Sequence, residues 1–128
     1  MSGYSNTNSV LTTVDVSNSP NLTDLHMTHH QFLQNINVST NINLVSLNIY
    51  DNDIIGSLDL SNNTALTDLN CADNQITSLD VRNGNNQNMT IGATSNNITV
   101  VYVDNIAGAN ALVTSGAWLF DSGVTFSL

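Results

Sequence analysis

Three histidines lie close together near the start of the sequence, at positions 26, 29 and 30. Histidine rings bind zinc or nickel when three or four ligands converge on one ion. His26 stands between apolar Leu25 and Met27 and is expected to point outward, whereas His29 and His30 follow in a turn. This spacing does not make convergence automatic, and no Glu or second Cys lies nearby. Two interpretations stay open, a transition-metal site and a substituted repeat with surface histidines, and the second is favoured.

Asp59 and Asp80 form a second candidate site. If they occupy equivalent positions on neighbouring strands, about 4.8 Å separates them, and the two like charges repel unless a cation or solvent screens them. Calcium is the expected cation, because hard ions prefer carboxylate and amide oxygens. A solvated acidic face is the favoured alternative. The stretch DNDIIG at 51–56 is not a calcium loop, because Ile55 replaces a required ligand and no Glu follows.

No residue pattern indicates an enzyme. Cys71 is the chain's one cysteine, and it aligns with apolar positions of the pattern described below. It is therefore expected to be a small buried hydrophobe rather than a nucleophile. Paired carboxylates would need a cleft around them, which a thin stack of short strands does not provide.

The elements that carry these residues repeat along the chain. An L-x-x-L-x-V spacing of apolar residues recurs about every 11 residues from Leu11 to Val103, and alternate units resemble each other most. The full repeat is thus about 22 residues long and has two similar halves. Each half contains an apolar–polar–apolar triplet, typical of a very short strand with one buried face. Asn, Asp, Ser, Thr and Gly between the triplets suit turns.

One stretch carries a family resemblance. LTDLNCADNQITSLDV at 66–81, preceded by LDLSNNTA at 58–65, resembles bacterial leucine-rich repeats of the nested 21–22-residue type. Such repeats occur in Bacteroidetes surface proteins and are similar to those of internalins. The resemblance covers about 11–103, with an irregular segment at 82–97. It implies binding or adhesion at the cell surface or outside the cell, with no shared catalytic residue.

The expected fold is an all-β, leucine-rich-repeat-like parallel β-solenoid with two short strands per coil of about 22 residues. We expect an N-terminal flank or partial cap at 1–10, the repeats at 11–103, and a C-terminal cap at 104–128. Within that cap, AWLFDSGVTFSL at 117–128 predicts a β-hairpin, because Trp118 and Phe120 alternate with other residues before a DSG turn. The alternative is an aromatic patch that docks a partner.

Composition narrows the choice of partners. The 128-residue chain has one strong base, Arg82, and a formal net charge of -9. Such a charge repels nucleic-acid phosphates and anionic lipids, so neither partner is expected. No apolar run is long enough to span a membrane. The first ten residues lack the basic start and apolar stretch of a signal peptide.

Two outward columns of the repeat are the predicted binding faces. Their members are Asp15, Asn37, Asp59, Asp80 and Tyr102 in one column, and His26, Asn48 and Asn70 in the other. The predicted function is a non-enzymatic extracellular module that contacts a protein or glycan through one strand face. No cofactor is expected beyond the calcium considered above.

Two other functions remain open. The first is a structural subunit, such as a virion surface or tail protein or an extracellular filament built from copies of the chain. It fits the missing signal peptide and the few apolar residues available to cover the first coil. The second is an ice-binding face of stacked threonines, but Gln34, Val45 and Gly56 interrupt that array.

Overall fold

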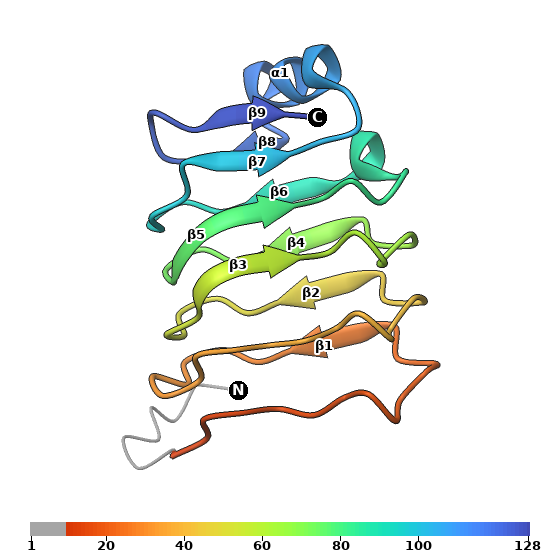
Figure 1. Cartoon of the computed structure of the whole chain (residues 1–128), viewed down its shortest axis with the longest axis vertical. Coiled ribbons are helices and arrows are strands. Elements are labelled where there is room, and N and C mark those ends of the chain that lie inside the picture. Colours follow the sequence, from red (N-terminus) through yellow and green to blue (C-terminus); the bar gives the residue numbers. More distant parts are fainter. Residues whose placement is uncertain (1–9) are drawn as a thin grey trace.

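A computed structural model describes residues 10–128 of the chain. The strands form two parallel sheets that face each other and run in opposite directions (Figure 1). The five-stranded sheet contains, in spatial order, β1 (Asp24–His26), β2 (Ser46–Asn48), β4 (Asp68–Asn70), β6 (Thr90–Gly92) and β8 (Trp118–Leu119). The four-stranded sheet contains β3 (Ile55–Asp59), β5 (Gln75–Asp80), β7 (Val100–Tyr102) and β9 (Thr125–Ser127).

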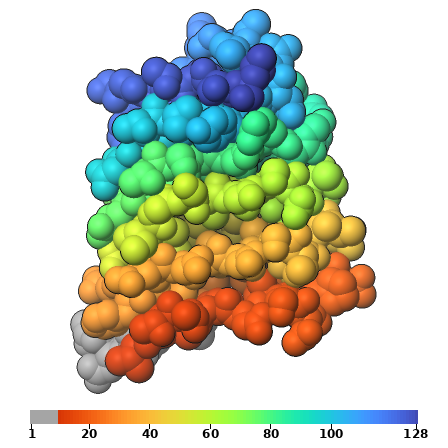
Figure 2. Space-filling model, viewed as in Figure 1, coloured from red at the N-terminus to blue at the C-terminus, as the bar shows by residue number. Residues whose placement is uncertain are grey.

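Strand register follows the repeat length. In the five-stranded sheet Leu25 pairs with Leu47, which pairs in turn with Leu69, so each step is 22 residues. In β1 and β4 the central residue is buried and its two neighbours are exposed. Side chains alternate across a strand, so each of these two triplets places one apolar side chain between the sheets and two polar ones outside. The chain therefore stacks as successive 22-residue repeats, which we call levels, seen as bands of colour in Figure 2.

The core lies between the sheets and is almost wholly aliphatic. Buried residues include Leu47, Leu69 and Leu79, each at most 3% exposed. Cys71 is also fully buried, which confirms the prediction that it is a core residue.

Asparagines hold the turns at both ends of each level. The buried Asn63 side chain donates through Nδ2 to the carbonyl oxygens of Val38 (2.9 Å) and Asn41 (3.0 Å). At the opposite end Asn74 does the same for Ile49 (2.8 Å) and Cys71 (3.1 Å). Buried turn carbonyls need donors. Asn63 supplies two carbonyls of the preceding level, whereas Asn74 supplies one of the preceding level and one of its own.

The turn after each strand of the five-stranded sheet contains a left-handed residue. His29, Asp51, Asp73 and Ser95 have φ values of 54–63° and stand 22 residues apart. Asp and Asn tolerate this conformation better than most residues do. His29 thus occupies a backbone position that its sister levels fill with Asp or Ser.

The C-terminal region differs from the expectation. Residues Ile106–Ser115 form helix α1. Asn105 is its N-cap, and the Asn105 side chain accepts a hydrogen bond from the Gly108 backbone N–H (3.0 Å). The helix ends at Gly116, whose φ of 82° is the left-handed conformation of a helix C-cap. In Figure 1 it covers the C-terminal end of the sheets.

The predicted C-terminal hairpin is also wrong. β8 pairs with β6 and β9 pairs with β7, so the two strands of 117–128 belong to different sheets and do not pair with each other. Trp118 lies in the core, where its Nε1 donates to the carbonyl oxygen of Met89 (3.0 Å). Its ring contacts Phe120 and Phe126 at centroid distances of 6.2 and 6.1 Å.

The expected fold class therefore needs correction. The chain is not an all-β solenoid, because it contains α1, and its strands form two separate parallel sheets. Among residues 10–128, no strand pairing joins these sheets into a closed coil. The segment at 82–97 contains a short 3-10 helix, η1 (Asn86–Asn88), and β6. Of the predicted flank at 1–10, residues 1–9 lie outside the described residues.

In the part of the chain that the structure describes, no helix has the length and apolar character needed to cross a membrane.

Candidate binding face on the five-stranded sheet

The three histidines have separate partners. His26 is exposed on β1, with Nε2 3.4 Å from Ser46 Oγ. His29 Nδ1 lies 2.6 Å from Asp51 Oδ2, and both side chains are largely exposed. The His30 backbone N–H donates to Asn52 Oδ1 (2.8 Å). Within residues 10–128, no three His, Cys, Asp or Glu side chains are grouped so that they could hold a metal.

Asp59 and Asp80 do lie on one face, directly opposite each other in β3 and β5. Each carboxylate already accepts hydrogen bonds from the residue two positions after it, in the turn that follows its strand. Asp59 Oδ1 accepts from the Ser61 backbone N–H (2.9 Å) and hydroxyl (2.6 Å). Asp80 accepts from the Arg82 backbone N–H (3.0 Å) and from its guanidinium Nη2 (2.7 Å). Bonding to Arg82 lowers the pKa of Asp80.

The same turn follows the two earlier residues of this column, Asp15 and Asn37. Asp15 Oδ1 accepts from the Ser17 N–H (2.9 Å), and Asn37 Oδ1 accepts from the Ser39 N–H (3.0 Å). Each side chain closes the turn that follows its strand. Hydrogen bonds from Ser17 also lower the pKa of Asp15. Four of the five residues predicted in this column therefore have a structural role.

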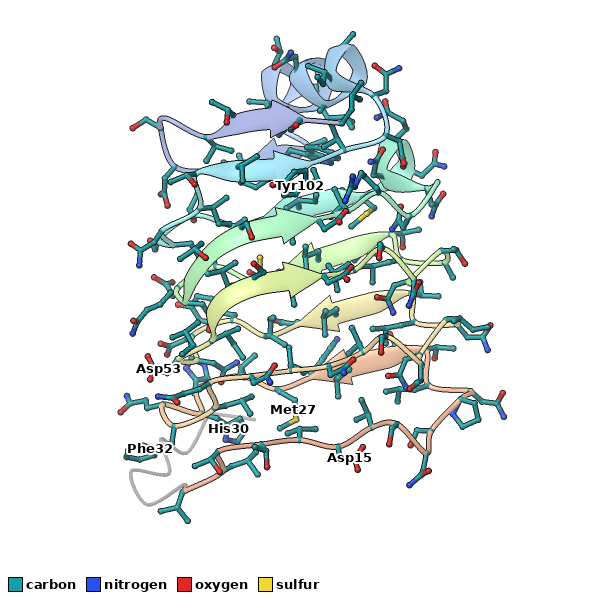
Figure 3. All side chains as sticks on the ribbon, in the orientation of Figure 1. Asp15, Met27, His30, Phe32, Asp53 and Tyr102 are labelled. Carbon is teal, nitrogen blue, oxygen red and sulfur yellow. The ribbon has the colours of Figure 1, made fainter. Side chains whose placement is uncertain are left out.

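Tyr102 is the exception in the column. It pairs with Asp80 across β7 and β5, and its ring centroid lies 4.9 Å from the Arg82 guanidinium carbon. In Figure 3 the labelled Asp15 lies towards the N-terminal end and Tyr102 towards the C-terminal end of the molecule. Asp80, Arg82 and Tyr102 thus form one patch on the four-stranded sheet in which Arg82 contacts the other two residues, and Asp59 lies beside Asp80 in register.

The other predicted column has a different environment. His26, Asn48 and Asn70 are in register on β1, β2 and β4. They line an open hollow of about 330 Å³ on the outer face of the five-stranded sheet. Its remaining lining residues are Ser46, Leu47, Asp68, Leu69 and Thr90.

The two asparagine side chains of the hollow are each held by one hydrogen bond, and each keeps unused donors. Asn48 Oδ1 accepts from the Tyr50 N–H (3.1 Å), and Asn70 Oδ1 accepts from the Ala72 N–H (3.3 Å). Neither Nδ2 group has a hydrogen-bond partner among residues 10–128. Two amide donors are therefore held in place on adjacent strands and remain available to a ligand.

Asp68 supplies the matching acceptor. Its Oδ1 accepts from Thr90 Oγ1 (3.0 Å) and its Oδ2 from Thr67 Oγ1 (2.9 Å). A carboxylate has about four acceptor positions, so two remain for a ligand. These threonine hydroxyls hold the carboxylate in one orientation on the exposed side of β4.

The sequence-based prediction missed three polar residues of this hollow, Ser46, Asp68 and Thr90. It considered the position after each central apolar residue and not the position before it. Yet both neighbours of a buried strand residue point outward. The alternation that selected Asn48 and Asn70 would also have found these three residues.

Cys71 lies in an environment that disfavours its reactive thiolate form. Burial raises the pKa of its thiol to about 12, so the reactive thiolate is scarce at neutral pH.

Comparison with known proteins gives no identification: no family model matches the chain, and neither the curated proteins nor the solved structures contain a match. The resemblance to leucine-rich repeats stays a prediction.

Proposed function

We propose that the protein is a non-enzymatic binding module that acts outside the cell and contacts a protein or glycan through the outer face of the five-stranded sheet. The observation that carries this proposal is the hollow over β1, β2, β4 and β6. There the Nδ2 groups of Asn48 and Asn70 have no hydrogen-bond partner among residues 10–128, and both residues line the hollow with Asp68, whose carboxylate is held by two threonines. Fixed polar groups lose little freedom when a ligand binds, which favours affinity.

The four-stranded sheet is the weaker choice. Its Asp59 and Asp80 side chains close their own turns, and Arg82 is committed to Asp80 and to the ring of Tyr102. A ligand on this sheet would have to compete with those internal bonds. A ligand on the five-stranded sheet could bind the Nδ2 groups of Asn48 and Asn70 without breaking an internal hydrogen bond.

A pair of matched variants tests which face binds. Asn70 on β4 and Thr77 on β5 are both exposed strand residues, one on each sheet. Asn70→Trp and Thr77→Trp place the same bulk over either face. Wild type and both variants are applied to arrays of immobilised extracellular proteins and oligosaccharides, with circular dichroism as the check on folding.

Binding should be kept by wild type and Thr77→Trp and weakened at least about tenfold in Asn70→Trp, as expected when bulk fills the centre of an interface. The proposal fails if wild type binds no array member. It also fails if Thr77→Trp, and not Asn70→Trp, loses binding.

The location outside the cell is a separate part of the proposal, supported by the resemblance to surface-protein repeats. Antibody labelling of intact and permeabilised cells of the source organism tests it. Labelling of intact cells is expected, whereas labelling only after permeabilisation would contradict an extracellular location.

A further inference from the structure

The hollow combines one acceptor and several donors at short range. Asp68 and Asn70 flank Leu69 on β4, so their side chains emerge from the same side of the strand. Asn48 lies beside Asn70 on β2, one strand spacing or about 4.8 Å away. A carboxylate accepts hydrogen bonds, whereas an amide NH₂ group donates them. A ligand that fills this hollow must therefore carry donors and acceptors on neighbouring atoms.

Adjacent hydroxyl groups of a sugar ring meet this requirement, because each hydroxyl both donates and accepts. One hydroxyl can donate to Asp68 while its neighbour accepts from the Asn70 amide. The size also agrees, since about 330 Å³ lies at the lower end of the range of about 300–1,000 Å³ for small-molecule sites. The register of Asn48 with Asn70 offers a second donor to the next ring of a chain.

Charge narrows the class of sugar. The chain's one strong base, Arg82, follows β5 on the other sheet and is bound to Asp80. Asp24 and Asp68 lie on the five-stranded face, in a chain of net charge -9. Sulfated, sialylated or uronic acid sugars would face carboxylates with no Lys or Arg beside them to compensate.

Cationic sugars fit poorly for a different reason. An ammonium group would be attracted to Asp68, but it offers only donors and so cannot accept from the free Nδ2 groups of Asn48 and Asn70. An uncharged sugar avoids both conflicts.

We propose that this hollow binds a neutral oligosaccharide, with Asp68 accepting from its hydroxyls and Asn48 and Asn70 donating to them. This inference rests on the proposed function, because it names the ligand class of the same face. Thr67 and Thr90 act as positioning residues that hold the Asp68 carboxylate.

The test uses arrays of neutral, sialylated, sulfated and amino oligosaccharides beside the protein array, followed by calorimetry with the neutral oligosaccharide that binds most strongly. Asp68→Asn keeps the shape of the side chain and removes its charge. The control is Asp59→Asn, which makes the same change at an exposed position on the other sheet. Thr90→Val removes one hydroxyl that orients Asp68 and leaves the carboxylate intact.

Wild type should bind neutral members in preference to the charged ones. Asp68→Asn should weaken that binding at least about tenfold, as expected for lost charge-assisted hydrogen bonds. Asp59→Asn should change it by less than about twofold. Thr90→Val should weaken it severalfold. The preference among wild-type ligands needs no variant, so it remains decisive if a variant fails to fold.

Each contrary result is specific. A preference for charged sugars overturns the inference, as does equal binding by wild type and Asp68→Asn. Binding to proteins alone, lost in Asn70→Trp, overturns the inference and leaves the proposed function standing. Binding to neither class of array member overturns both.

Discussion

Asp59 and Asp80 lie directly opposite each other on β3 and β5, yet each carboxylate accepts a hydrogen bond from the backbone N–H of the residue two positions later in the sequence. Two like charges on adjacent strands would ordinarily oppose pairing. Here each side chain closes a turn, and Arg82 partly neutralises Asp80. The fold thus gives both carboxylates a structural role, and the calcium bridge suggested by the sequence stays a prediction.

Two replacements of Asp59 distinguish the contribution of its hydrogen bonds to stability from that of its charge. Asp59→Ala removes the acceptor for the Ser61 N–H and should lower the free energy of unfolding by about 1 kcal/mol. Asp59→Asn keeps an acceptor oxygen and relieves repulsion with Asp80, so it should be nearly neutral. Urea unfolding measures both variants. Equal losses would show that the turn does not depend on this hydrogen bond.

Removing the buried amide of Asn63 should be much more costly. Asn63→Ala leaves the carbonyl groups of Val38 and Asn41 without a side-chain donor, and we expect a loss of about 2–4 kcal/mol in the free energy of unfolding. Asn62→Ala is the control, because that neighbour is exposed and the hydrogen bond that its side chain donates, to the Ser39 carbonyl oxygen, is 3.4 Å long. Similar losses in the two variants, measured by urea unfolding, would contradict the structural role of the buried amides.

The Asp121 carboxylate should make stability depend on pH. Its two oxygens accept the backbone N–H groups of Ser95 and Asn96, both at 3.0 Å, and these bonds lower its pKa from the ordinary 3.8. Because the folded-state pKa is the lower one, the stabilisation is fully present above about pH 4 and disappears as the pH falls through the folded value.

Asp121→Asn provides the comparison, since an amide has one acceptor oxygen and no charge. Wild type should exceed this variant in urea midpoint at pH 7, and the difference should shrink below pH 3.8. A difference that stays constant across this range would show that the carboxylate charge contributes nothing.

Glycine at position 95 should stabilise the fold. Ser95 has a φ of 57°, which costs a residue with a Cβ atom but not glycine. Ser95→Gly should raise the free energy of unfolding by about 0.5–1 kcal/mol. Val100→Gly, at a regularly paired position of β7, should lower it by at least a similar amount. Thermal and urea unfolding report both changes, and a destabilised Ser95→Gly variant would contradict the assigned backbone conformation.

The alternation of apolar residues was enough to identify much of the core. Leu25, Leu69 and Cys71 are buried because each occupies an apolar position of the repeating pattern. The same alternation placed His26 outside the core, where the structure has it exposed. These properties depend on local geometry, in which neighbouring side chains of a strand point to opposite faces.

The C-terminal helix could not be recognised in the same way. Its sequence, IAGANALVTS, has no charged residue and buries only Ala109, so it shows little of the apolar stripe expected of an amphipathic helix. Its limits depend instead on Asn105 and Gly116, two signals that are common in any loop. The pairing of β8 and β9 with different sheets is a long-range property, and no local pattern distinguishes it from a hairpin.

The most direct test of the binding face is a nitrogen-15 NMR titration with the array component that binds most tightly. Our account predicts that the amide signals of Ser46, Asn48, Asp68 and Asn70 shift, and that those of Asp59, Asp80 and Tyr102 do not. Shifts confined to the four-stranded sheet, or to helix α1, would contradict it.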